Sequence, residues 1–210
     1  MRLEKKRAII TGAGTGIGRA IAERFCVEGA NVMVAEIETQ GGEETVKRIL
    51  KSGGTAIFQQ TDTSKEDSIQ CMVECMVSEF GGIDIVVNNA AAFVFGSIEE
   101  TGPEEWAKVF SVNVIGYANT IKSALTFLKK SKNAAIVNIA SVSSFIAQPE
   151  FLPYNTSKGA ISQMTRCLAM DLAKYNIRVN AVCPGAIYTR ASEKHMDFMG
   201  LDHEKGRELF

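Results

Sequence analysis

The fold of this chain is decided near its N-terminus by residues 9–18, which read Ile-Ile-Thr-Gly-Ala-Gly-Thr-Gly-Ile-Gly. A short apolar run leads into the glycines, and an amphipathic stretch follows from Arg19. This order predicts a buried strand, a tight turn and then a helix whose free N–H groups and dipole favour a phosphate. The glycines are spaced Gly-x-x-x-Gly-x-Gly, unlike the commonest dinucleotide fingerprint, Gly-x-Gly-x-x-Gly. On this stretch alone, a glycine turn that binds no ligand stays an alternative.

Composition indicates one soluble globular domain. The chain has 210 residues, of which 46% are hydrophobic, and 23 Lys and Arg oppose 24 Asp and Glu. A net charge near zero argues against nucleic acid or an anionic membrane as a partner. The charged N-terminus leads into only a short apolar strand, and no apolar run approaches membrane-spanning length. These features predict a cytoplasmic protein that does not bind membranes.

The cysteines predict neither disulfides nor a metal site. Their number, five, is odd, and they are scattered through expected helices and a strand. Such a pattern is typical of reduced thiols. Cys71 and Cys75 are one helical turn apart, but both histidines, His195 and His203, lie far off in the sequence. We therefore expect no metal ion to be bound.

Apolar runs alternate with amphipathic stretches along the chain. We expect strands at residues 7–11, 32–35, 55–60, 83–87, 134–140 and 177–182, and helices at 17–29, 42–52, 64–80 with Ser64 as N-cap, 103–130 and 154–175. Strands that are apolar throughout belong to parallel sheets covered on both faces. Right-handed crossovers then favour the strand order 3-2-1-4-5-6. The prediction is a single doubly wound α/β domain of the Rossmann type.

Ligands of such sheets bind at the carboxyl ends of the strands. The expected strands are followed by polar or turn residues: the glycine turn, Glu36, Asp62, Asn88-Asn89-Ala90, Ser141 and Pro184-Gly185. Each alone is an ordinary strand-ending residue. Their coincidence along the same edge indicates a binding site.

Glu36 predicts which dinucleotide the site binds. It lies 18 residues beyond Gly18, close to the interval expected for a carboxylate that accepts from the adenosine ribose. A carboxylate there would repel a 2′-phosphate, so the sequence favours NAD over NADP. The alternative is a solvated charge at the end of the second strand.

Tyr154 and Lys158 are candidates for acid–base chemistry. They are four residues apart at the start of an expected helix and therefore project from one face. A nearby ammonium stabilises a phenolate and lowers the tyrosine pKa from its usual value near ~10. Ser141, at the end of the fifth strand, is placed to donate to a substrate oxygen. For an isolated Tyr-x-x-x-Lys, however, a pair on a helix surface is the commoner explanation.

Taken together, these motifs resemble the short-chain dehydrogenase/reductase family. The resemblance is carried, in order, by Thr11-Gly12-Ala13-Gly14-Thr15-Gly16-Ile17-Gly18, Asn88-Asn89-Ala90, Ser141, Tyr154-Asn155-Thr156-Ser157-Lys158 and Pro184-Gly185. It extends to about Thr189 and accounts for the unusual glycine spacing. It implies hydride transfer between NAD and a secondary alcohol or ketone.

The resemblance also implies a role for individual residues. The implied cofactor site comprises Gly12, Thr15, Gly16, Ile17, Gly18, Glu36, Asp62, Thr63, Asn89, Ala90, Tyr154, Lys158, Pro184, Gly185, Ile187 and Thr189. The implied catalytic residues are Tyr154 as acid/base, Lys158 on the nicotinamide ribose, Ser141 on the substrate oxygen and Asn113 supporting a water in the proton relay.

Residues 1–187 are expected to form the catalytic part of the domain, and residues 188–210 its substrate loop. Ser143 and Gln148 join Ser141 and Tyr154 as expected substrate contacts. Loop residues expected near the pocket, either as apolar walls or as packing, are Phe93, Phe95, Phe145, Phe151, Leu152 and Tyr188. Sugars, steroids, fatty-acyl ketones and simple secondary alcohols all stay open as substrates.

The chain departs from the family pattern in two places. Ala91 follows Asn-Asn-Ala where glycine is usual, and we expect a local adjustment there. Family members continue past the length of this chain with a helix and a seventh strand, so the sixth strand is expected to be an unpaired apolar edge.

Two other functions are alternatives to an enzyme. A non-catalytic dinucleotide-binding scaffold is the alternative of the same fold. A Walker-type phosphate site is disfavoured because Arg19-Ala20, rather than Lys-Ser/Thr, follows the glycines. The family resemblance further implies a homodimer or homotetramer that pairs the helices at 103–130 and 154–175.

Overall fold

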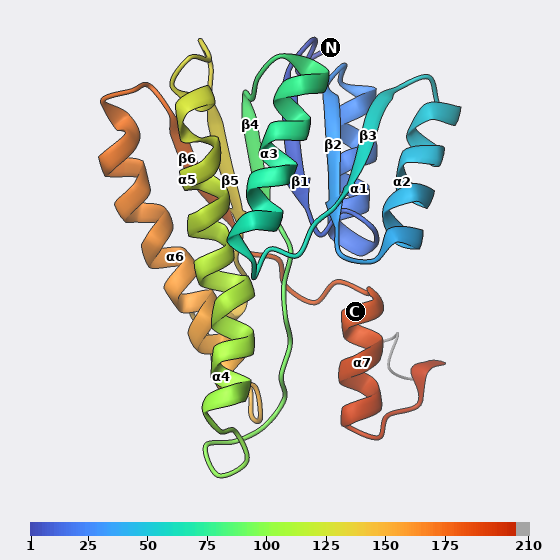
Figure 1. Cartoon of the computed structure of the whole chain (residues 1–210). Helices are drawn as coiled ribbons and strands as arrows, with labels where there is room; N and C mark the ends of the chain where they lie inside the picture. Colours follow the sequence, from blue (N-terminus) through green and yellow to red (C-terminus); the bar gives the residue numbers. More distant parts are fainter. Residues whose placement is uncertain (205–210) are drawn as a thin grey trace.

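Six parallel strands form the centre of the structure, in the predicted order β3-β2-β1-β4-β5-β6 (Figure 1). This computed structural model describes residues 1–204. The strands are β1 (Arg7–Thr11), β2 (Asn31–Glu36), β3 (Thr55–Gln60), β4 (Ile85–Asn88), β5 (Ala135–Ile139) and β6 (Arg178–Val182). Each neighbouring pair is parallel, which confirms the predicted doubly wound α/β fold.

Helices cover both faces of the sheet. They are α1 (Gly16–Val27), α2 (Thr39–Lys51), α3 (Glu66–Phe80), α4 (Pro103–Phe110), α5 (Gly116–Leu128), α6 (Leu152–Ala173) and α7 (Arg190–Phe198). Alternate side chains of β1 point to opposite layers. Ile9 packs in the core beneath α3, α5 and α6, whereas Ala8 and Ile10 pack beneath α1 and α2. In Figure 1, α7 stands apart from the sheet, below its carboxyl edge.

Two helix predictions need correction. The helix expected over residues 103–130 is interrupted between α4 and α5 by a π-helical turn, η1 (Ser111–Ile115). A π turn inserts an extra residue into the helical register, which hydrophobic periodicity does not reveal. Ser64 is not an N-cap, because α3 begins after Lys65. The Ser64 hydroxyl instead donates to Asp62 at 2.6 Å, at the end of β3.

The outer edge of β6 is unpaired within residues 1–204. Its inward residues Val179 and Ala181 pack with the helical layer of α6. Val182 is 50% exposed, but Arg178 and Asn180 on the same face are polar and exposed. The edge is therefore less apolar than the sequence predicted. No helix in the described part of the chain is long and apolar enough to cross a membrane.

An ion pair between the partly buried Arg7 and the buried Asp84 links the amino end of β1 to the start of β4. The Arg7 guanidinium donates to both Asp84 oxygens, at 2.8 and 3.0 Å, and Ser131 donates to the same carboxylate at 2.5 Å. Asp84 is 6% exposed. Burial raises the pKa of Asp84, but the hydrogen bonds from Arg7 and Ser131 outweigh it and hold this pKa at about 2.

We predict that Asp84→Asn lowers the free energy of unfolding at neutral pH by about 2–3 kcal/mol, because it leaves Arg7 without its counter-charge. The pKa of Asp84 lies below its ordinary value of 3.8, so the stabilisation is complete above that value and is lost as pH falls through about 2. Urea titrations of both proteins from neutral pH to acid measure the difference.

Asp171→Asn, on the exposed side of α6, is the matched control and should change the unfolding free energy by less than about 0.5 kcal/mol. Equal effects of the two substitutions at neutral pH would contradict the role given to the ion pair.

Candidate active site

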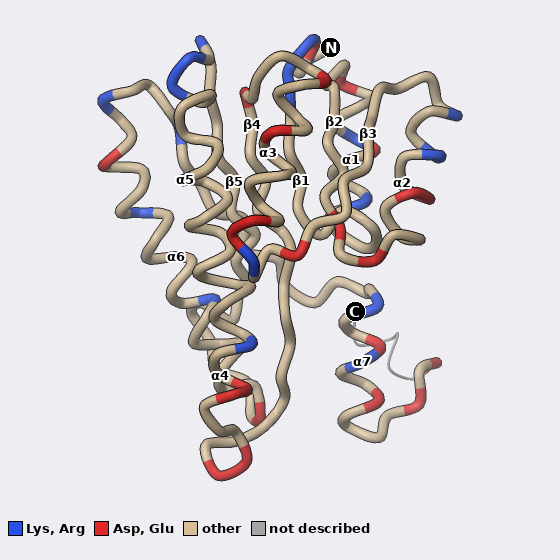
Figure 2. Tube along the Cα trace, in the orientation of Figure 1, with Lys and Arg blue, Asp and Glu red and all other residues tan. Residues whose placement is uncertain are grey.

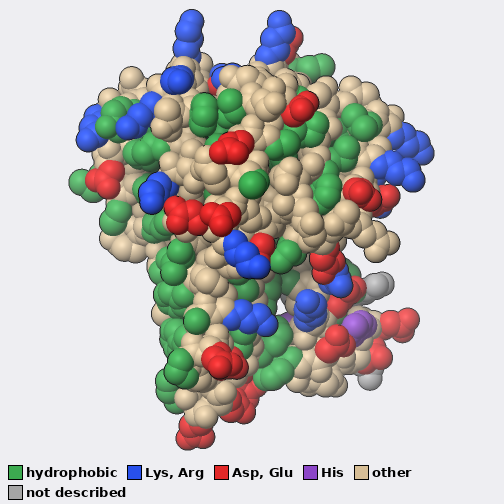
Figure 3. Space-filling view, in the orientation of Figure 1, with side chains coloured by type: hydrophobic (Ala, Val, Ile, Leu, Met, Phe, Trp, Pro, Cys, Tyr) green, Lys and Arg blue, Asp and Glu red, His purple; other side chains and the backbone are tan. Residues whose placement is uncertain are grey.

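A cavity of about 810 Å³ opens at the carboxyl ends of the strands. The space-filling view shows the molecule hollowed between the part that contains α4 and the part that contains α7 (Figure 3). The predicted site residues that line it are Gly12, Thr15, Gly16, Ile17, Glu36, Asp62, Thr63, Asn89, Ala90, Ser141, Ser143, Gln148, Tyr154, Lys158, Pro184, Gly185, Ile187 and Thr189. Of the predicted site residues, Gly18 and Asn113 do not line it.

The glycine turn presents backbone donors to this cavity. Helix α1 begins at Gly16, and its N-cap Thr15 makes no side-chain hydrogen bond to the first turn. The first turn also holds no acidic residue. The backbone N–H groups of the first turn of α1 are therefore available to bind a ligand. The positive end of the helix dipole favours a negatively charged one, such as a phosphate group.

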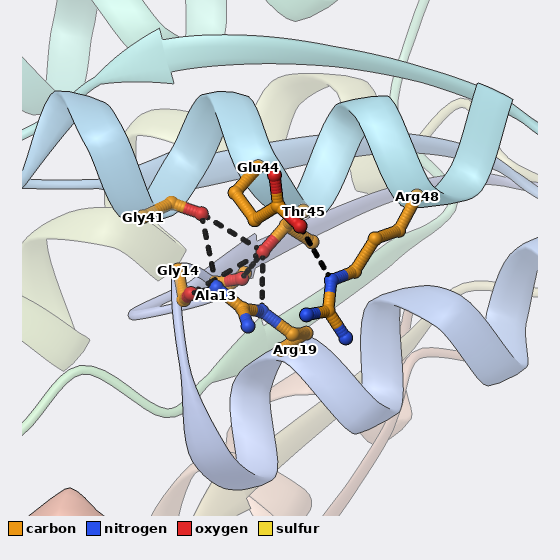
Figure 4. Close-up of polar contacts among 7 residues, drawn as sticks. All are labelled: Ala13, Gly14, Arg19, Gly41, Glu44, Thr45 and Arg48. Atoms are coloured by element: carbon orange, nitrogen blue, oxygen red, sulfur yellow. Dashed lines mark hydrogen bonds and ion pairs between the residues drawn. The ribbon is translucent and has the colours of Figure 1, made fainter. Parts of the chain in front are cut away.

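The back of the turn is fixed by α2 and by Arg19 (Figure 4). The Thr45 hydroxyl lies 2.9 Å from the carbonyl oxygen of Ala13 and accepts from Arg19 Nε at 2.9 Å. The Arg19 guanidinium also donates to the Gly14 carbonyl. Because a trans peptide is planar, the N–H of Thr15 points away from Arg19. On the side that faces α2, the carbonyls of the turn are therefore hydrogen-bonded to Thr45 and Arg19. On the other side, Thr15 lines the cavity.

The turn also contacts the loop that follows β4. The Thr11 hydroxyl accepts from the backbone N–H groups of Asn89 and Ala90 at 3.0 and 3.1 Å. The Asn89 side-chain amide donates to the carbonyls of Thr11 and Gly12 at 3.0 and 2.9 Å. The ends of β1 and β4 are therefore held together where the strand order reverses. This is the position at which such sheets bind their ligands.

Gly18 is a packing residue and not a residue of the cavity wall. A Cβ at position 18 would lie 2.1 Å from the carbonyl oxygen of Gly12. At Gly12, where φ is +64°, a Cβ would lie 2.7 Å from Ala90 Cα. The two glycines allow α1, the turn and the loop after β4 to approach one another. In this structure Gly18 packs closely behind the turn, and its predicted contact with the cofactor stays a prediction.

We predict that Gly18→Ala lowers the free energy of unfolding by roughly 1–3 kcal/mol, because the turn must move to admit the methyl group. Thermal unfolding followed by circular dichroism measures the loss. The control is Gly159→Ala in α6, where a Cβ would meet no atom within 4 Å. It should leave stability unchanged or raise it by up to about 1 kcal/mol. Equal destabilisation by both substitutions would contradict the packing explanation.

Glu36 is held at the edge of the cavity by backbone donors. One carboxylate oxygen accepts from Gly14 N at 2.8 Å, and the other accepts from Ile37 N and Glu38 N at 2.9 and 3.2 Å. These contacts fix a negative charge beside the glycine turn. Sequence spacing indicated the position of this residue but not the three backbone donors that orient it.

Tyr154, Lys158 and Ser141 meet in the cavity, as the motif predicted. Tyr154 and Lys158 come from the first turns of α6, and the lysine Nζ lies 5.5 Å from the centre of the tyrosine ring. Lys158 is 2% exposed and donates to the Ile139 carbonyl at 2.8 Å. Ser141, just after β5, lines the same cavity, and its hydroxyl lies close enough to Tyr154 to act on the pKa of that phenol.

The expected lowering of the Tyr154 pKa is wrong for this structure. Burial raises the pKa of Tyr154 to about 12, although the Ser141 hydrogen bond opposes the rise. Burial likewise lowers the pKa of Lys158 to about 7, opposed by the nearby Cys183. Desolvation disfavours the charged form of both groups. The spacing of the motif showed that the two side chains are neighbours but not how deeply they are buried.

Asn113 lies in η1 and is fully buried. Its amide donates to the Ala92 carbonyl and to Ser157 Oγ, at 3.1 and 3.0 Å, and its oxygen accepts from Ala92 N at 2.7 Å. Each polar atom of the side chain thus has a protein partner. Asn113 ties the loop after β4 to α6 behind the cavity wall. The neighbouring Ala91 has no positive φ, so alanine replaces the family's glycine without backbone strain.

The predicted aromatic walls are confirmed in part. Phe93, Phe95 and Phe151 line the cavity, whereas Phe145 is 68% exposed and lies outside it. Leu152 and Tyr188 are also absent from its lining. The polar residues Ser143 and Gln148 line it and are joined by a hydrogen bond of 2.8 Å.

Helix α7 supplies cavity residues that the sequence reasoning missed: His195 and Met196, followed by Met199 and Leu201. Thr189 caps this helix, and Arg190 forms an exposed ion pair with Glu38 at 2.8 Å. Tyr188 donates to Glu193 at 2.7 Å. Helix α7 has an amphipathic pattern, which signals a packed face but does not identify the cavity against which that face lies. Of the expected substrate loop, the last six residues lie outside the described part of the chain.

Lys and Arg positions alternate with Asp and Glu positions along the outer helices (Figure 2). This mixture agrees with the near-zero net charge of the sequence. Within residues 1–204, no group of His, Cys, Asp and Glu side chains is arranged to hold a metal ion. The five cysteines are free thiols.

A doubly wound parallel sheet with a glycine turn at the carboxyl edge of its first strand is the arrangement of dinucleotide-binding domains. Residues 6–199 match the family model described as short chain dehydrogenase. The chain belongs to this family and is a dinucleotide-dependent oxidoreductase.

Named relatives agree with this assignment. Glucose 1-dehydrogenase 2 of Bacillus subtilis is 40% identical over 196 residues, which cover 90% of this chain and 75% of that protein. The NADP-dependent (R)-specific alcohol dehydrogenase of Lentilactobacillus kefiri is 39% identical over 193 residues, with coverage of 90% and 75%. A crystal structure of 3-ketoacyl-(acyl-carrier-protein) reductase from Brucella melitensis complexed with NADH superposes with a TM-score of 0.85. It is 35% identical, and the match covers 90% of this chain and 78% of that one.

Proposed function

We propose that this protein transfers a hydride between NAD and a secondary alcohol or its ketone, with Tyr154 as the acid/base. The observation that carries the proposal is that Tyr154, Ser141 and Lys158 share one cavity with the glycine turn. When bound, NAD supplies the nicotinamide carbon that accepts or returns the hydride. The protein residues bind and orient the reactants and move the proton.

Tyr154 and Ser141 act on the substrate oxygen. At neutral pH Tyr154 is protonated, because burial raises its pKa to about 12, so its hydroxyl donates the proton that a ketone oxygen needs on reduction. In the oxidation direction the same oxygen accepts the alcohol proton once Tyr154 has been deprotonated to the phenolate. Ser141 lines the same cavity and lies close enough to Tyr154 to act on its pKa, and we place its hydroxyl on the substrate oxygen beside the phenol. Ser143 and Gln148, which the sequence predicted as further substrate contacts, line the cavity and are hydrogen-bonded to each other.

Lys158 and Asn113 have supporting roles in this proposal. Lys158 holds the nicotinamide ribose and, when protonated, stabilises a Tyr154 phenolate. Asn113 fixes the loop after β4 and, through its position, supports the water of the proton relay. The residues proposed to hold the cofactor are Gly12, Thr15, Gly16, Ile17, Glu36, Asp62, Thr63, Asn89, Ala90, Pro184, Gly185, Ile187 and Thr189. The homodimer or homotetramer and the cytoplasmic location stay predictions from the sequence.

The preference for NAD rests on Glu36. Its carboxylate is fixed beside the glycine turn, where a 2′-phosphate would add a second negative charge. The Lentilactobacillus kefiri relative is NADP-dependent, so the choice of dinucleotide varies among relatives of this chain. The fixed charge of Glu36 is what favours NAD here.

We predict that Tyr154→Phe lowers turnover by a factor of about 10²–10⁴, because it removes the proton donor without changing the ring. Alcohol-dependent formation of NADH measures the rate, and NADH fluorescence measures binding, which should persist. In the unsubstituted protein, alcohol oxidation should accelerate as pH rises above neutral toward the pKa of Tyr154.

Tyr175→Phe is the matched control, because Tyr175 is an exposed tyrosine outside the cavity. It should keep full turnover. Near-complete activity of Tyr154→Phe would overturn the assignment of the acid/base. Tight NADH binding without turnover of any alcohol or ketone in a broad panel would instead favour the non-catalytic scaffold.

We predict that the unsubstituted protein binds NADH at least about tenfold more tightly than NADPH, which corresponds to roughly 1.4 kcal/mol. Glu36→Gln should reduce this ratio, because the amide carries no charge to repel the phosphate. Fluorescence titration with both dinucleotides measures it. Glu43→Gln, on the exposed face of α2, should leave the ratio unchanged. Tighter binding of NADPH by the unsubstituted protein would reject the preference.

A further inference from the structure

The ring of Tyr154 is flanked by two phenylalanines that line the cavity. Phe93 stacks on it, with 4.7 Å between ring centres and 21° between planes. Phe151 meets it edge-on at 5.8 Å. The surroundings of the Tyr154 phenol, where the substrate would react, are therefore aromatic.

This aromatic wall continues onto α7. Phe95 packs edge-on against Phe151 at 4.9 Å and stacks with His195 and Phe198 at 5.5 and 4.9 Å. His195 in turn packs edge-on against Phe151 at 4.5 Å. Burial lowers the pKa of His195 below its ordinary value, so its ring is uncharged at neutral pH. The loop after β4 and α7 thus present one continuous uncharged wall.

Several serine and glutamine side chains that line the cavity are already hydrogen-bonded within the protein. Ser143 donates to Gln148 at 2.8 Å, and Ser141 donates to Ser143 at 3.0 Å. Ser192 of α7 donates to backbone carbonyls, including that of Thr189 at 2.7 Å. A polyol buried here would leave hydroxyl groups without partners, which is costly. An apolar substituent has no hydrogen bonds to water to lose on binding, and it gains apolar contact with the aromatic rings.

On the basis of the proposed function, we infer that the substrate is a secondary alcohol or ketone with an aromatic ring on the reacting carbon, and that Phe95 determines this specificity. In the oxidation, the carbinol C–H bond breaks and its hydride goes to NAD. The hydroxyl proton goes to the Tyr154 oxygen in its phenolate form, and the C=O bond of an aryl ketone forms. The aryl ring lies against Phe95 and the rings packed on it.

The first test uses the unsubstituted protein with NAD and three alcohols: 1-phenylethanol, propan-2-ol and sorbitol. The expected order of kcat/KM places 1-phenylethanol first, at least about tenfold above propan-2-ol, from the burial and stacking of its ring. Sorbitol is expected last. Preferred turnover of sorbitol would overturn the inference while leaving the proposed hydride transfer in place. Absence of turnover with all three, despite tight NADH binding, would count against the proposed function itself.

The second test separates specificity from structure. Phe95→Leu keeps an apolar side chain but removes the flat ring, and should lower kcat/KM for 1-phenylethanol about five- to tenfold, mainly through KM. The ratio of kcat/KM for 1-phenylethanol to kcat/KM for propan-2-ol should therefore fall. Phe145→Leu is the matched control on an exposed loop and should change neither value. An equal loss of activity with both alcohols in Phe95→Leu would overturn the role of Phe95 in specificity.

Discussion

The structure depends on the contact between the glycine turn and the loop after β4. Thr11 and Asn89 exchange hydrogen bonds there, and the absence of a side chain at Gly12 lets Ala90 approach the turn. These contacts join the ends of two strands that are neighbours in the sheet and far apart in the sequence. They set the position of α1, whose free N–H groups face the cavity, relative to the strands that carry the other polar residues. A shift of the glycine turn relative to the loop after β4 would move the N-terminus of α1 relative to Tyr154 and Ser141. Catalysis depends on the relative placement of these groups.

The sequence predicted the sheet and most residues of the site because both follow from local rules. Glycines at positions 12 and 16 permit the left-handed turn, and apolar runs separated by helical patterns imply parallel strands with crossovers. Polar residues that end such strands must then share one edge. The corrections concern properties that depend on packing in three dimensions. Gly18 proved to be a packing residue, and the register of the helix around Asn113 changes within a π turn.

The aromatic residues of the proposed substrate site could be predicted less well, because their positions depend on how loops and α7 pack. Phe93 and Phe95 lie in a loop whose path depends on Asn113 behind it, and His195 reaches the cavity only because of where α7 lies. Neither periodicity nor spacing encodes such placements. Among loop aromatics, the sequence gives no means to separate Phe95, which packs on three rings, from the exposed Phe145.

The buried lysine has a consequence for the folding equilibrium. Unfolding returns Lys158 to water, where its pKa recovers from about 7 toward 10.5, so the unfolded chain takes up a proton between these values. By linkage, the free energy of unfolding therefore rises with pH across this window, by up to about 1.4 kcal/mol per pH unit. At neutral pH this side chain therefore opposes folding, and the Ile139 carbonyl that accepts from it offsets only part of that cost. Replacing Lys158 by an apolar side chain would therefore stabilise the fold, so the protein retains this lysine at a cost in stability.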